Sequence, residues 1–235
     1  MVKMNKTGIC HICLEEKKLS FEHFPPESCF NDGKVKIANK ISQRGIGDYT
    51  LCDSCNNNTG RWYVKDYKKL VDTVATLLKS RFTEFDKDET ITGFGITITD
   101  INPLFCVKQM LVMICSLMPI EEIKGLNISQ FLLNKFSFLD GKEKFHLLVG
   151  ATLKEDESTL FKGPMIADGN RKLYCLSSFP LRILLVIGDK TSLRGYADFT
   201  EFLNSNVSNP ITCDFNIGFV KNDLFDFISE TIKNI

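Results

Sequence analysis

Two short cysteine motifs, Cys10-His-Ile-Cys13 and Cys52-Asp-Ser-Cys55, decide the fold of the first part of this chain. Each C-x-x-C motif places two thiolates on one tight turn, and two such pairs complete the tetrahedral set of soft ligands that Zn²⁺ prefers in structural sites. The residues between them, 14–51, hold many turn formers and little apolar periodicity, so apolar burial alone would stabilise them weakly. The sequence therefore predicts a four-cysteine zinc module. His11 is expected at the surface, because the four thiolates already fill the tetrahedron.

The composition is that of an ordinary globular protein. Of the 235 residues, 43% are hydrophobic and 25% are charged, and basic and acidic side chains are equal in number. Residues 1–81 hold 14 Lys and Arg against 9 Asp and Glu, which makes this part the basic one. That balance is compatible with nucleic-acid binding by the first part of the chain, and equally with ordinary surface charge.

Cysteine usage and the lack of long apolar segments bear on localisation. Nine cysteines without a recognisable signal peptide favour a reducing compartment, in which thiols bind metals or fill cores. No segment approaches the roughly 18 consecutive apolar residues that a membrane span needs. We therefore expect a cytoplasmic protein without a membrane partner.

The sequence as a whole predicts an α+β fold: the N-terminal zinc module, then an antiparallel α+β domain. An amphipathic helix is expected over about 63–82, with an acidic linker behind it. The expected parts are therefore residues 1–64, 65–89 and 90–235. In the last part, strands are expected at 90–99, 144–153, 173–176, 180–188 and 211–220, and helices from Asp100 or Asn102 onward, at 127–135 and at 223–232, with a helical turn at 200–203.

Residues 90–235 carry no readable chemistry. They would choose a substrate, sense a ligand or mediate assembly. Their apolar helix and the Phe-rich composition, with 19 Phe in the chain, hint at a homo-oligomer.

Glu22-His23 lies between the two cysteine motifs and is followed by Pro25-Pro26. A neutral imidazole accepts a proton from water near physiological pH, and a carboxylate is a hard oxygen ligand suited to Mg²⁺ or Mn²⁺. Together they suit one-metal hydrolysis of a phosphodiester bond. The simpler alternative is that His23 packs in a loop beside the zinc.

These motifs, with Leu51-Cys52 and Cys55-Asn56, resemble the zinc-bearing branch of the HNH nuclease family over roughly the first 65 residues. The resemblance implies a ββα-metal core in a treble-clef scaffold, with His23 as general base and Glu22 as a ligand of the catalytic Mg²⁺ or Mn²⁺. It further implies Asn56 as a second ligand, with Asn58 as its substitute. The family's middle asparagine has no counterpart in residues 44–50. There, Asp48 either orients His23 in its place or the position is empty.

Basic and aromatic residues near the second motif are candidates for contacts with nucleic acid: Lys34, Lys36, Lys40, Arg44, Arg61 and Trp62. Trp62 either stacks on a base or anchors the helix that follows. Three functions stay open. They are a DNA endonuclease, which by resemblance would act in bacterial or phage antiviral defence, a catalytically degenerate zinc-dependent nucleic-acid-binding or adaptor protein, and an RNA-directed nuclease.

Overall fold

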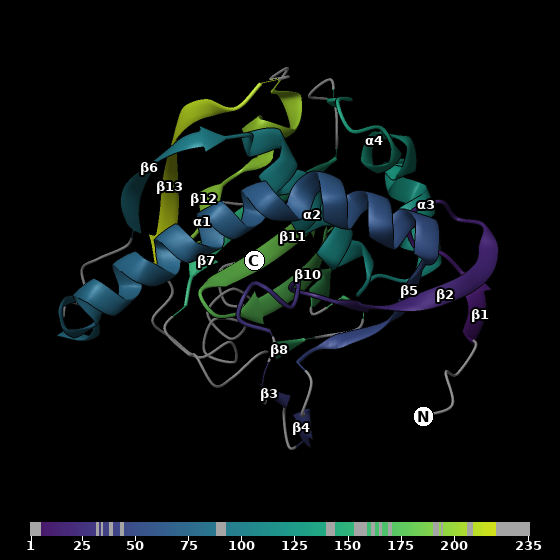
Figure 1. Ribbon diagram of the computed structural model, residues 1–235, viewed down its shortest axis with the longest axis horizontal. Helices are drawn as coiled ribbons and strands as arrows, with labels where there is room; N and C mark the ends of the chain where they lie inside the picture. Colours follow the sequence, from purple (N-terminus) through teal and green to yellow (C-terminus); the bar gives the residue numbers. More distant parts are fainter. Residues whose placement is uncertain are drawn as a thin grey trace.

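The chain folds into an α+β structure with antiparallel sheets, as the sequence predicts (Figure 1). The computed structural model describes residues 6–31, 33, 35–37, 40–42, 45–87, 93–139, 144–152, 159–160, 163–164, 166–168, 171–189, 193, 195–205 and 209–219. The strands are β1 (Lys6–Ile9), β2 (Glu16–His23), β3 (Val35–Ile37), β4 (Lys40–Ser42), β5 (Gly47–Cys52), β6 (Gly93–Ile101), β7 (Phe145–Ala151), β8 (Thr159–Leu160), β9 (Ile166–Asp168), β10 (Arg171–Ser178), β11 (Leu181–Ile187), β12 (Ala197–Asp198) and β13 (Ile211–Phe219). The helices are α1 (Asp53–Lys87), α2 (Pro103–Cys115), α3 (Ile120–Leu126), α4 (Ser129–Leu133) and the 3₁₀ turn η1 (Thr200–Asn204).

A small antiparallel sheet with the order β1-β2-β5 forms the first part of the molecule. The pairing of β2 with β5 shifts register between Ser20 and Phe21, so that Thr50 is an extra residue of β5. Strand β5 ends at Cys52 and α1 begins at the next residue. The segment between β2 and β5 contributes the separate hairpin β3-β4.

Helix α1 is longer than the sequence predicts. It has 35 residues and begins at Asp53 rather than near Tyr63, and it continues through residues 83–87, which were expected to be a linker. The prediction of a linker at 83–87 is therefore wrong; neither Gly nor Pro occurs between Gly60 and Gly93, so nothing in that sequence ends the helix. The predicted boundary at residue 64 falls within α1.

A large sheet has the order β6-β13-β7-β11-β10-β8, with β12 added to β7 and β9 to β10. All its pairings are antiparallel except that of β13 with β7. The expected antiparallel sheet is therefore confirmed, as is the helical turn at η1. The expected helix at 127–135 is shorter, as α4, and α3 precedes it. The expected helix at 223–232 lies outside the described residues.

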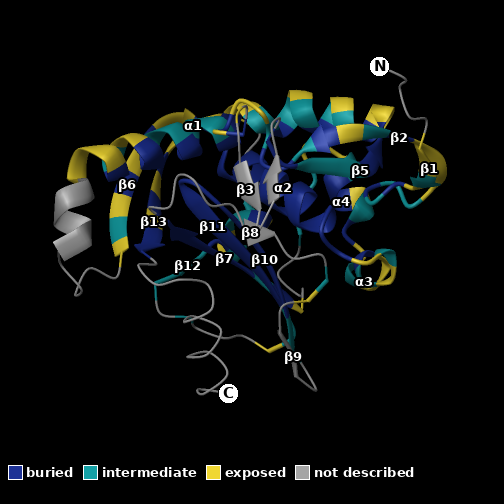
Figure 2. Ribbon diagram, turned by 90° about the horizontal axis from the view of Figure 1, so that it is seen from below, coloured by how far each residue is buried: buried dark blue, intermediate teal, exposed yellow. Residues whose placement is uncertain are grey.

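Helix α2 lies between α1 and the large sheet. Figure 2 shows α1 as the outer layer, with exposed residues on its outer side and buried α2 beneath it. All residues of α2 are buried, which confirms the expectation of a helix that is apolar nearly all round. Its N-cap is Asn102, whose side chain accepts a hydrogen bond from the backbone N–H of Phe105 at 3.3 Å, and Pro103 occupies the first helical position.

One apolar cluster includes residues of the small sheet, of α2 and of the large sheet. It contains Ile12 and Leu51 of the first part, Met113 of α2, and Phe215 of β13. The first part of the chain and the rest are therefore packed against each other. The division into domains stays a prediction. Within the described ranges, no helix combines the length and the apolarity that crossing a bilayer requires.

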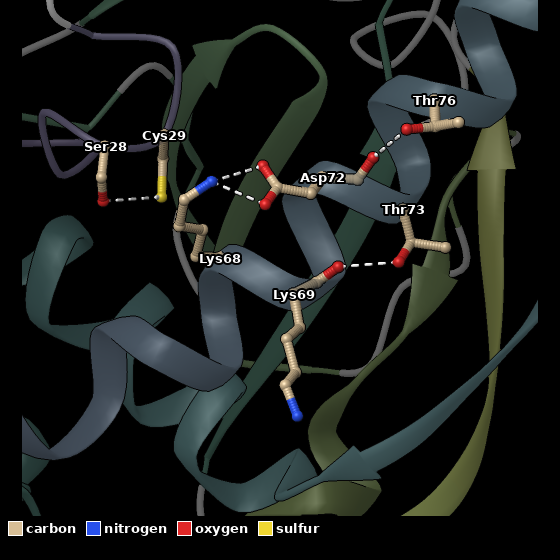
Figure 3. A network of polar contacts seen from close by, with 7 residues as sticks. All are labelled: Ser28, Cys29, Lys68, Lys69, Asp72, Thr73 and Thr76. Atoms are coloured by element: carbon tan, nitrogen blue, oxygen red, sulfur yellow. Dashed lines mark hydrogen bonds and ion pairs between the residues drawn. The ribbon is translucent and has the colours of Figure 1, made fainter.

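Lysines on α1 form ion pairs and ring contacts with other residues of the protein. Figure 3 shows Lys68 with both its hydrogen bonds to the carboxylate of Asp72, at 2.7 and 2.6 Å. Lys69 pairs with Asp100 at 2.7 Å, and Lys79 lies over the ring of Phe30 at 5.4 Å. The lysines of this helix therefore contribute to the stability of the fold.

Candidate metal centre

The side chains of Cys10, Cys13, Cys52 and Cys55 meet at one point, with all four sulfur atoms within 4.8 Å of one another. The sulfurs of Cys13 and Cys52 are 4.0 Å apart. In a tetrahedron of thiolates around a metal, with metal–sulfur distances of about 2.3 Å, sulfurs lie about 3.8 Å apart. The predicted gathering of these cysteines is therefore confirmed, and the cluster fits a metal ion.

Each half of the cluster is shaped by a local turn. Cys10 and Cys13 lie on the turn after β1, which is closed by a 2.9 Å hydrogen bond from the N–H of Leu14 to the carbonyl of Cys10. Leu14 adopts a left-handed φ of 61° there. Cys52 ends β5 and its N–H donates to the sulfur of Cys10 at 3.3 Å, while Cys55 lies in the first turn of α1. Backbone N–H groups and a helix N-terminus both stabilise negative charge on the sulfurs.

The thiols of the cluster interact with one another. The thiol of Cys55 donates a hydrogen bond to Cys10 and lowers the pKa of Cys10 to about 4, and the same contact raises the pKa of Cys55. Burial raises the pKa of Cys13. Thiolates are soft ligands that select zinc-like cations. A bound cation would replace the protons that the thiols share and would neutralise the negative charge of the thiolates.

Glu22 is a buried residue, with 6% of its surface exposed. Its Oε1 accepts hydrogen bonds from the hydroxyl of Thr50 at 2.5 Å and from the hydroxyl of Ser116 just beyond the end of α2. Burial raises the pKa of Glu22 to about 7, although both hydroxyl bonds oppose the shift. The carboxyl group therefore joins β2, β5 and α2.

His23 follows Glu22 in β2 and is only half-buried. Its ring packs edge-on against Phe21, with 5.1 Å between the ring centroids. Adjacent residues of a strand project to opposite faces, so Glu22 points into the interior while His23 and Phe21 share the other face. The structure does not bring Glu22 and His23 to one side of the strand. Their catalytic roles stay predictions.

Asn56, in the first turn of α1, contacts β2. Its Nδ2 donates to the hydroxyl of Ser20 at 3.2 Å and to the carbonyl of Phe21 at 3.4 Å, which brings Asn56 to the strand that ends in His23. Asn58 is half-buried in the same helix.

Asp48 pairs with Glu22 across β2 and β5. Its Oδ1 accepts from the N–H of Tyr49 at 2.7 Å and lies 3.6 Å from the ammonium of Lys6. Three of the predicted site residues, His23, Asp48 and Asn56, therefore lie on or against the same two strands. The proposed orientation of His23 by Asp48 stays a prediction.

The candidate contacts for nucleic acid are spread over several elements. Arg61 is exposed on α1, and Trp62 is half-buried and packs against the core, edge-on to Tyr63 at 5.9 Å. That position favours the alternative in which Trp62 anchors the helix. Lys36 lies in β3 and Lys40 in β4, and Lys34 and Arg44 lie outside the described residues.

A surface that the sequence did not single out lies on the exposed face of β2 and β5. We call Phe21, His23 and Tyr49, with Lys6 beside them, the aromatic patch. Phe21 is 44% exposed and packs edge-on against Tyr49 at 5.4 Å, and the Lys6 ammonium lies 5.7 Å from the centre of the Tyr49 ring. Exposed rings beside a cation are the groups that unpaired bases stack on.

Two further polar residues hold this region together. Asn31 is fully buried, and its amide bonds the carbonyls of Pro25 at 2.6 Å and Ile46 at 2.8 Å, while its Oδ1 accepts from the N–H of Ile46 at 2.6 Å. It joins the end of β2 to the start of β5. His11 is half-buried and lies outside the cysteine cluster, and its ring bonds the carbonyl of Cys115 at 2.7 Å. Its partner is 104 residues away in sequence, which no local pattern reveals.

The chain matches no family model, no curated protein and no solved structure. The resemblance to HNH nucleases therefore rests on the motifs themselves.

Proposed function

We propose that this protein is a zinc-bound, HNH-type endonuclease that hydrolyses DNA phosphodiester bonds with the aid of Mg²⁺ or Mn²⁺. The observation that supports the proposal best is the arrangement of β2, β5 and the first turn of α1. His23 ends β2, Asp48 lies in β5, and Asn56 bonds the backbone of β2 from the helix. Two antiparallel strands and a helix that carry these residue types are what the resemblance implies for a ββα-metal core.

In the proposed reaction, His23 accepts a proton from the attacking water through a ring nitrogen. Bound Mg²⁺ or Mn²⁺ would stabilise the charge that develops on the phosphate and the leaving oxygen. Asn56 offers an oxygen ligand for that cation. Asp48 is directly opposite Glu22 in the strand pairing and so projects to the other face from His23, like Glu22. Glu22 would offer a ligand only by leaving its hydrogen bonds to Thr50 and Ser116.

The four cysteines would hold Zn²⁺ in a structural role. They supply four thiolates and leave no coordination position for water or substrate, which is the composition of a closed site. The chemistry is then separate from the zinc, whose part is to fix β5 and the start of α1 against the turn after β1.

A cleavage assay tests the nuclease proposal. Supercoiled plasmid DNA and single-stranded RNA are incubated with the protein and Mg²⁺ or Mn²⁺, and wild type is compared with His23→Ala. His146→Gln, in the large sheet, is the matched histidine control. Loss of the base lowers the rate roughly 100-fold or more while the zinc content stays unchanged. Equal cleavage by wild type and His23→Ala would contradict the assignment of His23. Cleavage of RNA alone would instead support the RNA-directed nuclease.

A second candidate is a zinc-dependent nucleic-acid-binding protein without catalysis. It is favoured by the position of Glu22, which is buried, bonded to two hydroxyls and directed away from His23. Without a carboxylate ligand on the side of His23, a catalytic cation would be held weakly.

Binding measurements separate this candidate from the first. Labelled DNA and RNA strands are titrated with wild type, His23→Ala and Phe21→Ala and followed by fluorescence anisotropy. A binding protein shows no cleavage with any variant, normal affinity for His23→Ala, and affinity about 5- to 150-fold weaker for Phe21→Ala, since one stacked base contributes about 1–3 kcal/mol. Absence of binding by wild type would remove both nucleic-acid functions.

A further inference from the structure

The face of the large sheet opposite α2 carries a small apolar cluster of its own. Its members are Leu148, Leu173, Cys175, Leu184 and Val186, with Leu193 and Tyr196 packed against them. Arg182 lies on the same face of β11 as Leu184 and Val186, because every second residue of a strand projects to the same side. A guanidinium group is therefore placed in an apolar layer.

Arg182 is 3% exposed, and part of its hydrogen-bonding capacity is unused. Its Nε donates to the hydroxyl of Ser177 at 3.1 Å, while its Nη1 is buried and has no hydrogen-bond partner among the described residues. Within the same ranges, no carboxylate forms an ion pair with it. A guanidinium has five N–H donors and keeps its charge at any physiological pH, so a buried one requires acceptors. The described chain supplies too few.

The sheet beside Arg182 is bare of side chains. Arg182 pairs with Gly150 of β7, Gly150 with Gly218 of β13, and Gly218 with Gly93 of β6. Three neighbouring strands thus place glycine in one row that leads from Arg182 to the edge of the sheet. The backbone at Gly195 uses this space, since a Cβ on Gly218 would lie 2.1 Å from the Gly195 carbonyl oxygen.

A pocket of about 370 Å³ opens at the end of this row. It is lined by Gly93, Phe94, Gly95, Tyr196, Ala197, Asn216, Ile217 and Gly218. Tyr196 also packs against the apolar cluster that surrounds Arg182. Burial raises the pKa of the Tyr196 hydroxyl, and the positive charge of Arg182 opposes that shift. One side chain therefore lies beside both the pocket and the buried guanidinium.

We propose that Arg182, Ser177 and Tyr196 form a binding site for the oxyanion group of a small molecule, a phosphate or a carboxylate. The guanidinium supplies the charge and a fork of N–H donors, which match the oxygens of either group. Ser177 orients the fork through Nε, and the buried hydroxyl of Tyr196 is a further donor. The site lies on the opposite face of the sheet from α2, and it does not depend on the proposed nuclease activity.

Titration of the full-length protein tests the site. Sodium phosphate and sodium acetate are each titrated into the protein by calorimetry, and thermal unfolding is followed in phosphate, acetate and chloride at equal ionic strength. We expect phosphate or acetate to bind and to raise the unfolding temperature relative to chloride. If only one of the two anions binds, the result shows whether the site recognises a phosphate or a carboxylate.

Variants then locate the binding. Arg182→Gln weakens the affinity of the responding anion at least tenfold, and Ser177→Ala weakens it by a smaller factor. Arg171→Gln, at the start of the neighbouring strand β10, leaves it unchanged. Unchanged affinity in Arg182→Gln would overturn the proposal, and so would a wild-type protein that responds to neither anion. If Arg182→Gln fails to fold, the wild-type titrations and Ser177→Ala still decide, because affinity in Ser177→Ala equal to that of wild type also overturns the site.

Discussion

At the scale of single residues, Glu22 and Lys108 are two of the ionisable groups that the molecule holds away from water. The carboxyl of Glu22 is bonded to two hydroxyls, and the ammonium of Lys108 is enclosed by backbone carbonyls. Each is fixed by partners that are distant in the sequence; Ser116, for example, is 94 residues from Glu22. Neither environment is visible in local patterns, which show only an acid beside a histidine and a lysine in an apolar helix.

Glu22 makes stability depend on pH. Its pKa is about 7 in the folded protein against 4.5 for an exposed glutamate, so the folded state keeps a proton that the unfolded chain releases. This bound proton stabilises the folded state fully below about pH 4.5, and its contribution is lost as the pH rises to about 7. In Glu22→Gln this loss is absent. The free energy of unfolding of the variant, relative to wild type, therefore rises by up to about 3 kcal/mol between pH 5 and 8.

Denaturant unfolding at several pH values measures this difference, with zinc content checked at each pH. Glu16→Gln, exposed in the same strand, is the control and should follow wild type. A difference between Glu22→Gln and wild type that does not change with pH would contradict the buried, protonated carboxyl group.

Lys108 closes the end of α4. Its ammonium donates to the carbonyls of Phe131 at 2.8 Å, Asn134 at 2.7 Å and Lys135 at 3.2 Å, and burial lowers its pKa to about 7. Lys108→Met removes this buried donor from all three carbonyls, of which those of Phe131 and Asn134 keep hydrogen bonds from Ser137. We expect the free energy of unfolding to fall by about 3 kcal/mol. Denaturant unfolding measures it.

The exposed lysine of α3 provides the control for that change. Lys124→Met should alter the free energy of unfolding by less than about 1 kcal/mol, because its pair with Glu121 is on the surface. A Lys108→Met protein as stable as wild type would show that desolvation of the amine outweighs its hydrogen bonds.

At the scale of elements, sequence spacing predicts those that depend on local chemistry. The two C-x-x-C motifs lie on turns and meet, and α2 begins at the expected cap, Asn102. The start of α1 was missed because Asn56 to Gly60 are turn formers of low helix propensity. Here the helix begins directly after Cys52, where the cluster and packing outweigh propensity. Asn31 lies in a stretch rich in turn formers, and its buried bonds to both ends of the β2–β5 connection have no local signal.

The cysteine cluster should control the first elements of the fold. Wild-type protein is expected to contain about one equivalent of Zn²⁺, and Cys13→Ser to contain much less. Without the metal, amide protons of β1, β2 and β5 should exchange faster with solvent, because four sulfurs no longer fix β5 and α1 to the turn after β1. Metal analysis and hydrogen exchange measure the two effects.

Cys213→Ser in β13 is the matched control for that change, since its thiol lies outside the cluster. It should keep both zinc and protection of the small sheet. Full zinc occupancy in Cys13→Ser would contradict the four-cysteine centre.

At the scale of the whole molecule, the parts that the sequence suggested share one apolar cluster. The pattern of turn formers before Tyr63 and the periodicity after it suggested a boundary. Yet α1 runs through that boundary, and Ile12 and Leu51 belong to the same apolar cluster as α2. Contacts of this kind depend on the tertiary arrangement and leave no mark on composition or spacing.

The shared core predicts one cooperative unfolding transition. In differential scanning calorimetry, a zinc chelator should lower the temperature of the whole transition, with the calorimetric and van't Hoff enthalpies in agreement. Two transitions, of which the chelator shifts only one, would instead support independent domains.

The most direct test of the account concerns the metal centre, on which the first part of the fold depends. X-ray absorption at the zinc edge of the purified, metal-loaded protein reports the ligand atoms and their distances. The account predicts four sulfur ligands at about 2.3 Å and no nitrogen or oxygen ligand. A spectrum with nitrogen or oxygen ligands, or a protein that binds no zinc, would contradict it.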